Sequence, residues 1–111
     1  MTQSVAFIGL GAMGYRMAAH LPKHFDTVFV WNRNFAKAQQ HAVDFGTQAV
    51  ELAQAVQADI IFSCLPTSQD VESLIDTVQI KSGSIWIDCT SGVPEAAQRI
   101  AAKLKLQNID F

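Results

Sequence analysis

The sequence predicts an α/β protein built on a parallel sheet with helices on both of its faces. Short apolar runs rich in β-branched and aromatic residues alternate with stretches of helical spacing. The apolar runs are continuous rather than alternating, which is typical of strands buried on both faces. Because right-handed crossovers join such strands, we predict a doubly wound sheet in the strand order 3-2-1-4-5-6.

The apolar runs give the positions of the expected strands. We predict strands at Val5–Ile8, Thr27–Trp31, Ile60–Cys64 and Ile85–Ile87, with a short one near Thr47–Val50. Residues Asn108–Phe111 follow the last helical stretch and have the pattern of one more strand. Because natural domains seldom stop inside a strand, we expect a truncated polypeptide that ends in or before the sixth strand.

Apolar stripes at steps of three and four residues predict the helices. One stripe runs from Gly11 to Leu21 and is stopped by Pro22. The second stripe is Phe35, Ala38, Ala42 and Phe45, and Gly46 ends it. The third is Val71, Leu74, Ile75 and Val78, and the capping pair Thr67 and Asp70 precedes it. The fourth is Ala97, Ile100, Ala101 and Leu104, and Pro94 and Glu95 begin its helix. A short helix is expected at Leu52–Val56.

Composition limits the chain to one globular domain, residues 1–111. Half of the 111 residues are apolar, 16% are charged and the net charge is −2. These values exclude intrinsic disorder and give no reason to expect nucleic acid or an anionic membrane as a partner. No apolar run approaches the ~18 residues of a membrane-spanning helix, and the N-terminus lacks the pattern of a signal peptide. We therefore expect a cytoplasmic protein.

Cysteine and histidine give no sign of a metal site or a disulfide scaffold. Cys64 and Cys89 each close an apolar run, which predicts two reduced, buried thiols. Pro22 separates His20 from His24, and we interpret these two and His41 as surface residues. The side chains of Met13 and Met17 are expected in the core.

A glycine motif predicts a dinucleotide site. Gly9-Leu10-Gly11-Ala12-Met13-Gly14 is G-x-G-x-x-G, and it directly follows a predicted strand and opens a predicted helix. In this context the first glycine permits a tight turn, and the second lets a pyrophosphate approach the backbone N–H groups of the helix. The third lets helix and strand pack closely. The alternative is a glycine-rich turn without a ligand.

The end of the second strand favours NADP over NAD. NAD sites normally place an acid about twenty residues past the glycines, to bind the ribose 2′-hydroxyl. This chain has Asn32-Arg33-Asn34 there, and the next acid along the chain is Asp44. A guanidinium can pair with a 2′-phosphate instead, with Asn32 donating to the same group and Lys37 adding charge. The alternative is an ordinary solvated arginine.

Two further loops follow strands at the edge where such sheets bind ligands. They are Cys64–Ser68 and Asp88–Pro94, and both contain small hydroxyl residues and a proline. They are candidates for the nicotinamide side of the cofactor, and turn or capping chemistry alone would explain them equally well.

These segments together resemble the N-terminal, Rossmann-type cofactor domain of the β-hydroxyacid dehydrogenases. That family includes 3-hydroxyisobutyrate dehydrogenase, tartronate semialdehyde reductase and the glyoxylate/succinic semialdehyde reductases. The resemblance covers the whole chain and is carried by Phe7–Ala18, Val30–Asn34, Cys64–Pro66 and Asp88–Ser91. The combination of G-L-G-x-M-G-x-x-M with W-N-R is far more specific than the glycine motif alone.

The resemblance implies roles for individual residues. The glycine loop would hold the pyrophosphate, and Asn32 and Arg33 match the NADP-preferring members. Leu65 and Pro66 match a loop near the adenine and ribose, and Thr90 matches a hydroxyl near the nicotinamide. The predicted cofactor-binding residues are Gly9, Leu10, Gly11, Ala12, Met13, Gly14, Asn32, Arg33, Asn34, Leu65, Pro66 and Thr90. Val93 departs from the serine found in many members.

The family's catalytic residues have no counterpart in this chain. The substrate-binding D-A-P-V-S-G-G segment and the catalytic lysine come after the position of Phe111, the lysine near an all-helical second domain. We therefore assign no catalytic residue and expect this chain to bind nucleotide without turnover.

The implied parent enzyme is an oxidoreductase that transfers hydride between NADP and a short β-hydroxy acid or its semialdehyde. Its partners would be small molecules and further copies of itself. Two alternatives to this interpretation remain. The first is an imine reductase, because imine reductases share the glycine loop and the W-N-R segment. The second is a binding module that uses the fold without turnover.

Overall fold

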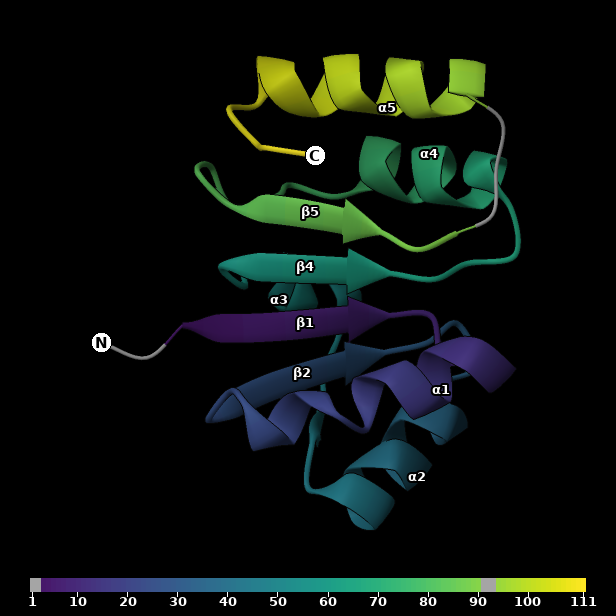
Figure 1. The fold of residues 1–111 in the computed structure, drawn as a ribbon, viewed down its shortest axis with the longest axis vertical. Coiled ribbons are helices and arrows are strands. Elements are labelled where there is room, and N and C mark those ends of the chain that lie inside the picture. Colours follow the sequence, from purple (N-terminus) through teal and green to yellow (C-terminus); the bar gives the residue numbers. More distant parts are fainter. Residues whose placement is uncertain (1–2, 91–93) are drawn as a thin grey trace.

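The computed structural model describes residues 3–90 and 94–111, which form a five-stranded parallel sheet flanked by helices (Figure 1). The strands are β1 (Ser4–Ile8), β2 (Thr27–Trp31), β3 (Gln48–Ala49), β4 (Ile60–Ser63) and β5 (Ile85–Asp88). The helices are α1 (Ala12–Ala18), the 3₁₀ helix η1 (Leu21–Lys23), α2 (Phe35–Phe45), α3 (Leu52–Ala55), α4 (Ser68–Thr77) and α5 (Pro94–Leu106).

The strand order β3-β2-β1-β4-β5 confirms the predicted doubly wound topology. The predicted strands are found within a residue or two of their expected bounds. After α5, Ile109 is buried and Asp110 forms a single parallel bridge to Ile85, on the outer side of β5. This is the position of a sixth strand in the predicted order.

Helix boundaries follow the expected capping chemistry, with one difference. Gly46 ends α2 in the left-handed conformation, with φ of 76°. Thr67 and Asp70 form the expected capping box at the start of α4. The first helix is shorter than predicted, because α1 ends at Ala18 and Pro22 lies inside η1 rather than directly after α1.

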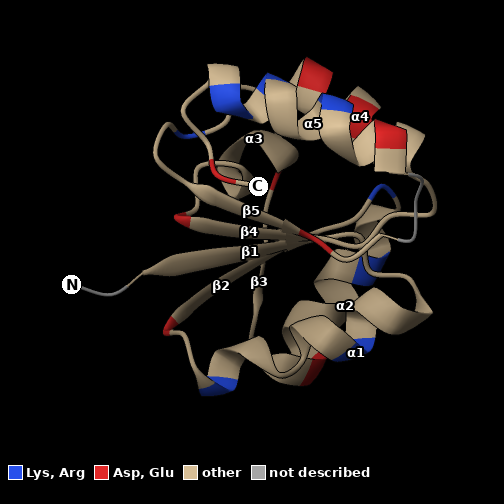
Figure 2. Ribbon diagram, turned by 45° about the horizontal axis from the view of Figure 1, so that its top comes forward, with Lys and Arg blue, Asp and Glu red and all other residues tan. Residues whose placement is uncertain are grey.

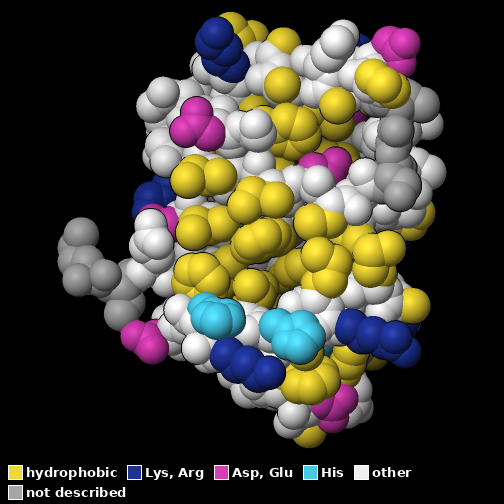
Figure 3. Space-filling model, viewed as in Figure 1, with side chains coloured by type: hydrophobic (Ala, Val, Ile, Leu, Met, Phe, Trp, Pro, Cys, Tyr) yellow, Lys and Arg dark blue, Asp and Glu magenta, His cyan; other side chains and the backbone are white. Residues whose placement is uncertain are grey.

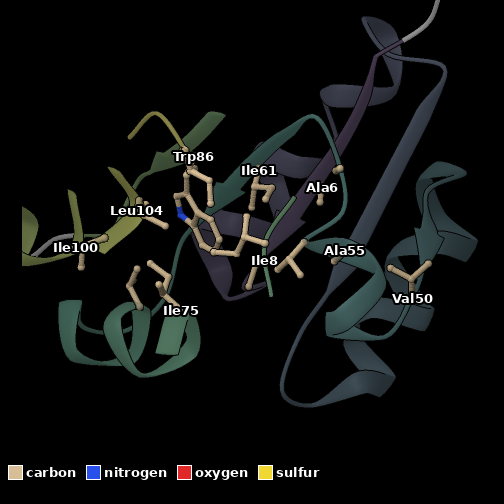
Figure 4. Close-up of a cluster of buried hydrophobic side chains, with 14 residues drawn as sticks. Ala6, Ile8, Val50, Ala55, Ile61, Ile75, Trp86, Ile100 and Leu104 are labelled. Carbon is tan, nitrogen blue, oxygen red and sulfur yellow. The ribbon is translucent and has the colours of Figure 1, made fainter. Parts of the chain in front are cut away.

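The two faces of the sheet have separate cores. Trp86 and Ile61 point to the face covered by α3, α4 and α5, where they meet Ile75 and Leu104 (Figure 4). Val5 and Phe7 point to the other face and pack with α1 and α2. Alternating side chains of β1 therefore supply both cores, which explains its continuous apolar sequence.

Helices α1 and α2 cover only part of their face. Beyond them, Ile85 and Ile87 of β5 are each 41% exposed, and Ile60 and Phe62 of β4 are only partly buried. Apolar side chains accordingly gather at the centre of this face (Figure 3). The result is an uncovered apolar sheet face made by Ile60, Phe62, Ile85 and Ile87.

Most charged residues belong to the helices and to the loops that join the elements (Figure 2). Helices α4 and α5 are joined by ion pairs, in which Lys103 lies 3.0 Å from both Glu72 and Asp76 and Arg99 lies 3.3 Å from Glu72. No helix in the described part of the chain is long and apolar enough to cross a membrane.

His41 is buried, so its prediction as a surface residue was wrong; His20 and His24 are exposed as predicted. Its Nδ1 lies 2.8 Å from the Thr47 hydroxyl and its Nε2 lies 3.0 Å from the Tyr15 carbonyl oxygen. The ring also makes an edge contact with the Tyr15 ring, at 4.6 Å between centroids. Polar partners for both nitrogens make the burial of this side chain possible.

Two other expectations about burial need correction. Met13 is 60% exposed, because it stands at the open start of α1, whereas Met17 packs against the core as predicted. Cys64 and Cys89 are free thiols as predicted but only half-buried, because both lie just past the ends of their strands.

Candidate functional site

The glycine loop forms the turn between β1 and α1 at the carboxyl edge of the sheet. The N–H of Gly9 donates to the carbonyl of Trp31 at 2.9 Å, which ties the loop to the end of β2. Gly11 is the N-cap residue of α1 and has no side chain to occupy the first N–H groups of that helix. The first turn, Ala12–Tyr15, contains no acidic residue. This helix end therefore presents free donors to an anion.

Gly9 and Gly14 have the structural roles that the sequence predicted, a tight turn and close packing. Gly9 has φ of 98°, and a Cβ there would collide with the Cys64 carbonyl oxygen. A Cβ on Gly14 would collide with the Gly9 carbonyl oxygen and lie 3.1 Å from the Phe7 ring. Within the described part of the chain, no atom beyond the neighbouring residues lies within 4 Å of the place where a Cβ on Gly11 would stand. The space at Gly11 is therefore open, whereas the other two glycines permit close packing.

Asn32 fixes the loop rather than standing free beside it. Its Oδ1 accepts the N–H of Leu10 at 2.9 Å, and its Nδ2 donates to the carbonyl of Asn34 at 3.0 Å. The end of β2 and the glycine loop are therefore held in one geometry. The second N–H of the Asn32 amide is the donor that it has left for a ligand.

A cleft of about 620 Å³ opens beside the glycine loop, between the end of β2 and helix α4. Its volume falls in the range of small-molecule sites. Nine of the twelve predicted residues line it: Gly9, Gly11, Ala12, Met13, Gly14, Asn32, Arg33, Leu65 and Pro66. Leu10 is fully buried beneath the loop, and Asn34 and Thr90 do not line the cleft.

The charge pattern of the cleft suits an anion at the end of β2. Arg33 is exposed at the cleft wall. Among the described residues, Asp70 is the only acidic side chain that lines the cleft. Its Oδ2 already accepts two hydrogen bonds from Thr67, one from the backbone N–H at 3.2 Å and one from the hydroxyl at 3.0 Å. The capping box of α4 thus occupies this carboxylate, and the Asn32–Asn34 segment that follows β2 contains no acid.

Several lining residues were missed by sequence reasoning: Trp31, Leu52, Asp70, Ser73, Leu74 and Thr77. Cys64 also lines the cleft, and it begins the Cys64–Ser68 loop that the sequence offered as a candidate. Ser73, Leu74 and Thr77 lie on one side of α4, and Leu52 begins α3. The step of three or four residues along α4 was visible in the sequence. The sequence did not show how α4 docks on the sheet, and this docking decides which side of the helix faces the cleft.

Thr90 connects the two loops that follow β4 and β5. Its hydroxyl accepts the N–H of Leu65 at 2.8 Å, and its own N–H donates to Asp88 at 3.0 Å. Asp88 also accepts the Ser63 hydroxyl at 2.9 Å, and Ser63 in turn accepts the indole N–H of Trp86 at 2.8 Å. Thr90 lines a separate cavity of about 230 Å³ with Asp88, Pro94 and Phe111. The departure at Val93, and Ser91 beside it, lie outside the described residues.

The described residues contain no group of three or more His, Cys, Asp or Glu side chains placed to hold a metal ion. Burial, followed by the nearby Asp88 carboxylate, raises the pKa of the Cys64 thiol. Burial also raises the pKa of the Cys89 thiol, with smaller contributions from Cys64 and Asp88.

Comparison with known proteins finds relatives among oxidoreductases. A reductive aminase of Aspergillus oryzae, described as NADPH-dependent, is 34% identical over 103 residues, which cover 91% of this chain and 35% of the relative. The 3-hydroxyisobutyrate dehydrogenase of Pseudomonas aeruginosa is 36% identical over 104 residues, which cover 87% of this chain and 35% of the relative. The chain therefore spans about a third of the length of either protein.

Solved structures show the same fold. The 3-hydroxyisobutyrate dehydrogenase of Mycobacterium tuberculosis superposes with a TM-score of 0.89 at 24% identity, over 99% of this chain and 39% of that one. The family model of the NAD binding domain of 6-phosphogluconate dehydrogenase matches residues 4–111. The match begins at β1 and includes the glycine loop, the cleft and the bridge at Asp110. The chain belongs to the family of this NAD binding domain.

Proposed function

We propose that this chain is the dinucleotide-binding part of an oxidoreductase and that it binds NADP in the cleft beside Gly11. The observation that carries the proposal is the open space at Gly11 in front of the uncapped start of α1, with Arg33 on the same cleft. NADP, when bound, supplies or accepts the hydride. The pyrophosphate would take the N–H groups of Gly11 to Met13, and the 2′-phosphate would pair with Arg33.

Other residues of the site shape and fix it. Asn32 and Thr90 hold the loops through the backbone of Leu10 and Leu65, so we propose them as positioning residues. Gly9 and Gly14 permit the tight packing. Leu65 and Pro66 line the same cleft as Arg33, and we propose that the adenine and ribose lie against them. Asn34, outside the cleft, contributes its carbonyl to the Asn32 amide.

For the whole protein we propose a cytoplasmic dehydrogenase that acts on a short β-hydroxy acid or its semialdehyde. The 3-hydroxyisobutyrate dehydrogenase among the relatives supports this substrate class. The reductive aminase supports the second candidate, an imine-reducing enzyme, at similar identity. We propose that substrate and catalytic groups come from a second, helical domain, and that copies of the protein associate through the uncovered apolar sheet face.

Reversal of charge at Arg33 tests the cofactor assignment. The wild type should prefer NADPH over NADH by about ten- to a hundredfold, because a charge-assisted pair contributes roughly 1.5–3 kcal/mol. Arg33→Asp should reverse this preference, since the aspartate repels the 2′-phosphate and accepts from the free ribose hydroxyls. The measurement is calorimetric titration of both cofactors at one ionic strength.

Lys105→Asp is the matched control, because it changes the charge equally on an exposed residue in the last turn of α5, away from the cleft. Its cofactor ratio should equal that of the wild type. An unchanged NADPH-to-NADH ratio in Arg33→Asp, or a wild type that prefers NADH, would show that the NADP assignment is wrong.

A further inference from the structure

The fold brings the two cysteines together, although 24 residues separate them in the sequence. Strands β4 and β5 pair in parallel from Ile60↔Ile85 to Ser63↔Asp88, so Cys64 and Cys89 are the next pair in this register. The N–H of Cys89 donates to the Ser63 carbonyl at 2.7 Å. A parallel ladder makes this bond when the residue after Ser63 is the partner of Cys89.

The spacing and the directions of the side chains suit a bond between the two sulfurs. Neighbouring strands lie about 4.8 Å apart, and disulfides join Cα atoms about 4.4–6.8 Å apart. Ser63, Asp88 and Trp86 form their hydrogen-bonded chain on one face of the sheet. Successive side chains alternate between faces, and Cys64 packs with the core on the opposite face. If the alternation of β5 continues by one residue past Asp88, Cys89 is directed to that same face, and the effect of Cys64 on the pKa of the Cys89 thiol agrees with their proximity.

This pair lies directly behind the cofactor cleft. Cys64 lines the cleft, and its carbonyl oxygen lies against Gly9 so closely that a Cβ would not fit between them. The next residue, Leu65, is held by Thr90, the residue that follows Cys89. A change in backbone at Cys64 or Cys89 would therefore move the glycine loop or the wall of the cleft. Both thiols are free and half-buried, so a small oxidant can reach them.

We propose that Cys64 and Cys89 form a redox-active dithiol, which hydrogen peroxide converts to an intramolecular disulfide and which thereby weakens dinucleotide binding in the cleft. One thiolate attacks a peroxide oxygen, the O–O bond breaks, and a water and a sulfenic acid result. The second sulfur then attacks the sulfenic sulfur, the S–O bond breaks and a second water leaves. Two thiols and one peroxide thus give one disulfide and two waters.

The surroundings make this dithiol slow to react and reversible. Burial and the Asp88 carboxylate raise the pKa of both thiols, so few thiolates are present at neutral pH. The pair therefore responds to sustained rather than brief exposure to oxidant. A thiol reductant reopens the bond by exchange.

The first test follows the chemistry at sulfur and does not depend on cofactor binding. The purified chain is treated with equimolar hydrogen peroxide, alkylated, and analysed by intact mass and peptide mapping without reductant. We expect both alkylatable thiols to disappear together and a Cys64–Cys89 cross-linked peptide to appear. In Cys64→Ser and Cys89→Ser, dimedone should trap a sulfenic acid instead. Separate oxidation of the two sulfurs, or only intermolecular cross-links, would overturn the proposal.

The second test measures the consequence, which rests on the proposed function. NADPH is titrated into the reduced chain, the oxidised chain and the oxidised chain after dithiothreitol. We expect affinity to fall by about tenfold on oxidation, within the range of coupled sites, and to recover on reduction. Cys89→Ser cannot form the disulfide, so its NADPH affinity should not show the tenfold fall after peroxide treatment. An oxidised chain with unchanged affinity would refute the coupling, whereas a reduced chain that binds no NADPH would refute the proposed function and leave the disulfide result standing.

Discussion

Gly11 and Gly14 both lack a side chain, but the space around the two residues differs. Variants at these two positions can therefore be compared with each other. Gly11 has ordinary backbone angles, with φ of −68°, and open space around it. Gly14 is buried on α1 against the glycine loop, where any Cβ meets the Gly9 carbonyl. The second glycine therefore serves the packing of the fold, and we propose that the first serves the ligand.

Gly11→Val should lose NADPH affinity by at least about tenfold and change the free energy of unfolding by less than about 1 kcal/mol, because the branched side chain fills only the space kept for the pyrophosphate. Gly14→Ala is the contrasting variant and should destabilise the fold by about 1–3 kcal/mol through overpacking. Denaturant unfolding and calorimetric titration of both variants decide this. A folded Gly11→Val that binds NADPH with wild-type affinity would show that the pyrophosphate does not bind at Gly11.

Sequence reasoning succeeded where a residue acts through the backbone and failed where a side chain finds a distant partner. The structural roles of Gly9 and Gly14 follow from a local turn, so the motif predicted them. The stripe assigned to α2 included Ala38 and Ala42 but passed over His41, because a polar residue gave no sign of burial. Its partners Tyr15 and Thr47 lie 26 and 6 residues away. Only the docked helices show them.

At the scale of elements, His41 joins α2 to α1 and to the start of β3. The Tyr15 carbonyl can only accept, so Nε2 carries the proton and the other nitrogen accepts from the Thr47 hydroxyl. Burial lowers the pKa of His41, against smaller opposite effects of the Tyr15 carbonyl and Asp44. Tyr15 itself donates to Asp44 at 2.7 Å, which ties the same two helices together at the surface.

This arrangement predicts a loss of stability in mild acid. An unfolded histidine takes up a proton near pH 6.5, and the folded His41 does so only at lower pH. The unfolded state thus binds more protons as the pH falls through this window, so the free energy of unfolding decreases there and levels off below the folded pKa. Above the unfolded pKa the effect is absent.

The measurement is denaturant unfolding at pH 8 and at pH 5.5. The decrease in unfolding free energy should be smaller in His41→Gln than in the wild type, because glutamine does not titrate. His24→Gln, at an exposed position, should keep the wild-type decrease. Equal decreases in the wild type and His41→Gln would show that His41 does not control the docking of α2 on α1 through its charge.

At the scale of the whole molecule, the sheet is covered unevenly. The alternation of strand and helix predicted the order of the strands, because each crossover is local and has one hand. It did not predict that α1 and α2 leave Ile85 and Ile87 exposed. Coverage depends on where each helix lies across the sheet. The continuous apolar sequence of β5 is compatible with burial of one face or of both, so it did not indicate which residues stay exposed.

The uncovered apolar sheet face predicts weak self-association. Burying the exposed part of one isoleucine contributes about 2 kcal/mol, from the transfer value of about 25 cal/mol per Å². A symmetric pair of faces would bury Ile60, Phe62, Ile85 and Ile87 from each copy, and the cost of association offsets most of this gain. Sedimentation should therefore show a dimer fraction that rises with concentration and persists at high salt, because the contact is apolar.

Ile87→Lys places a charge in the middle of this face and should shift the chain to monomer. Val43→Lys is the matched control, because Val43 is an exposed apolar residue on α2, at 81%, outside the face. This control should leave the association unchanged. A wild type that stays monomeric at every concentration would refute the prediction, and equal effects of the two lysines would locate the contact elsewhere. If only Ile87→Lys acts, the uncovered apolar sheet face is where a second copy packs.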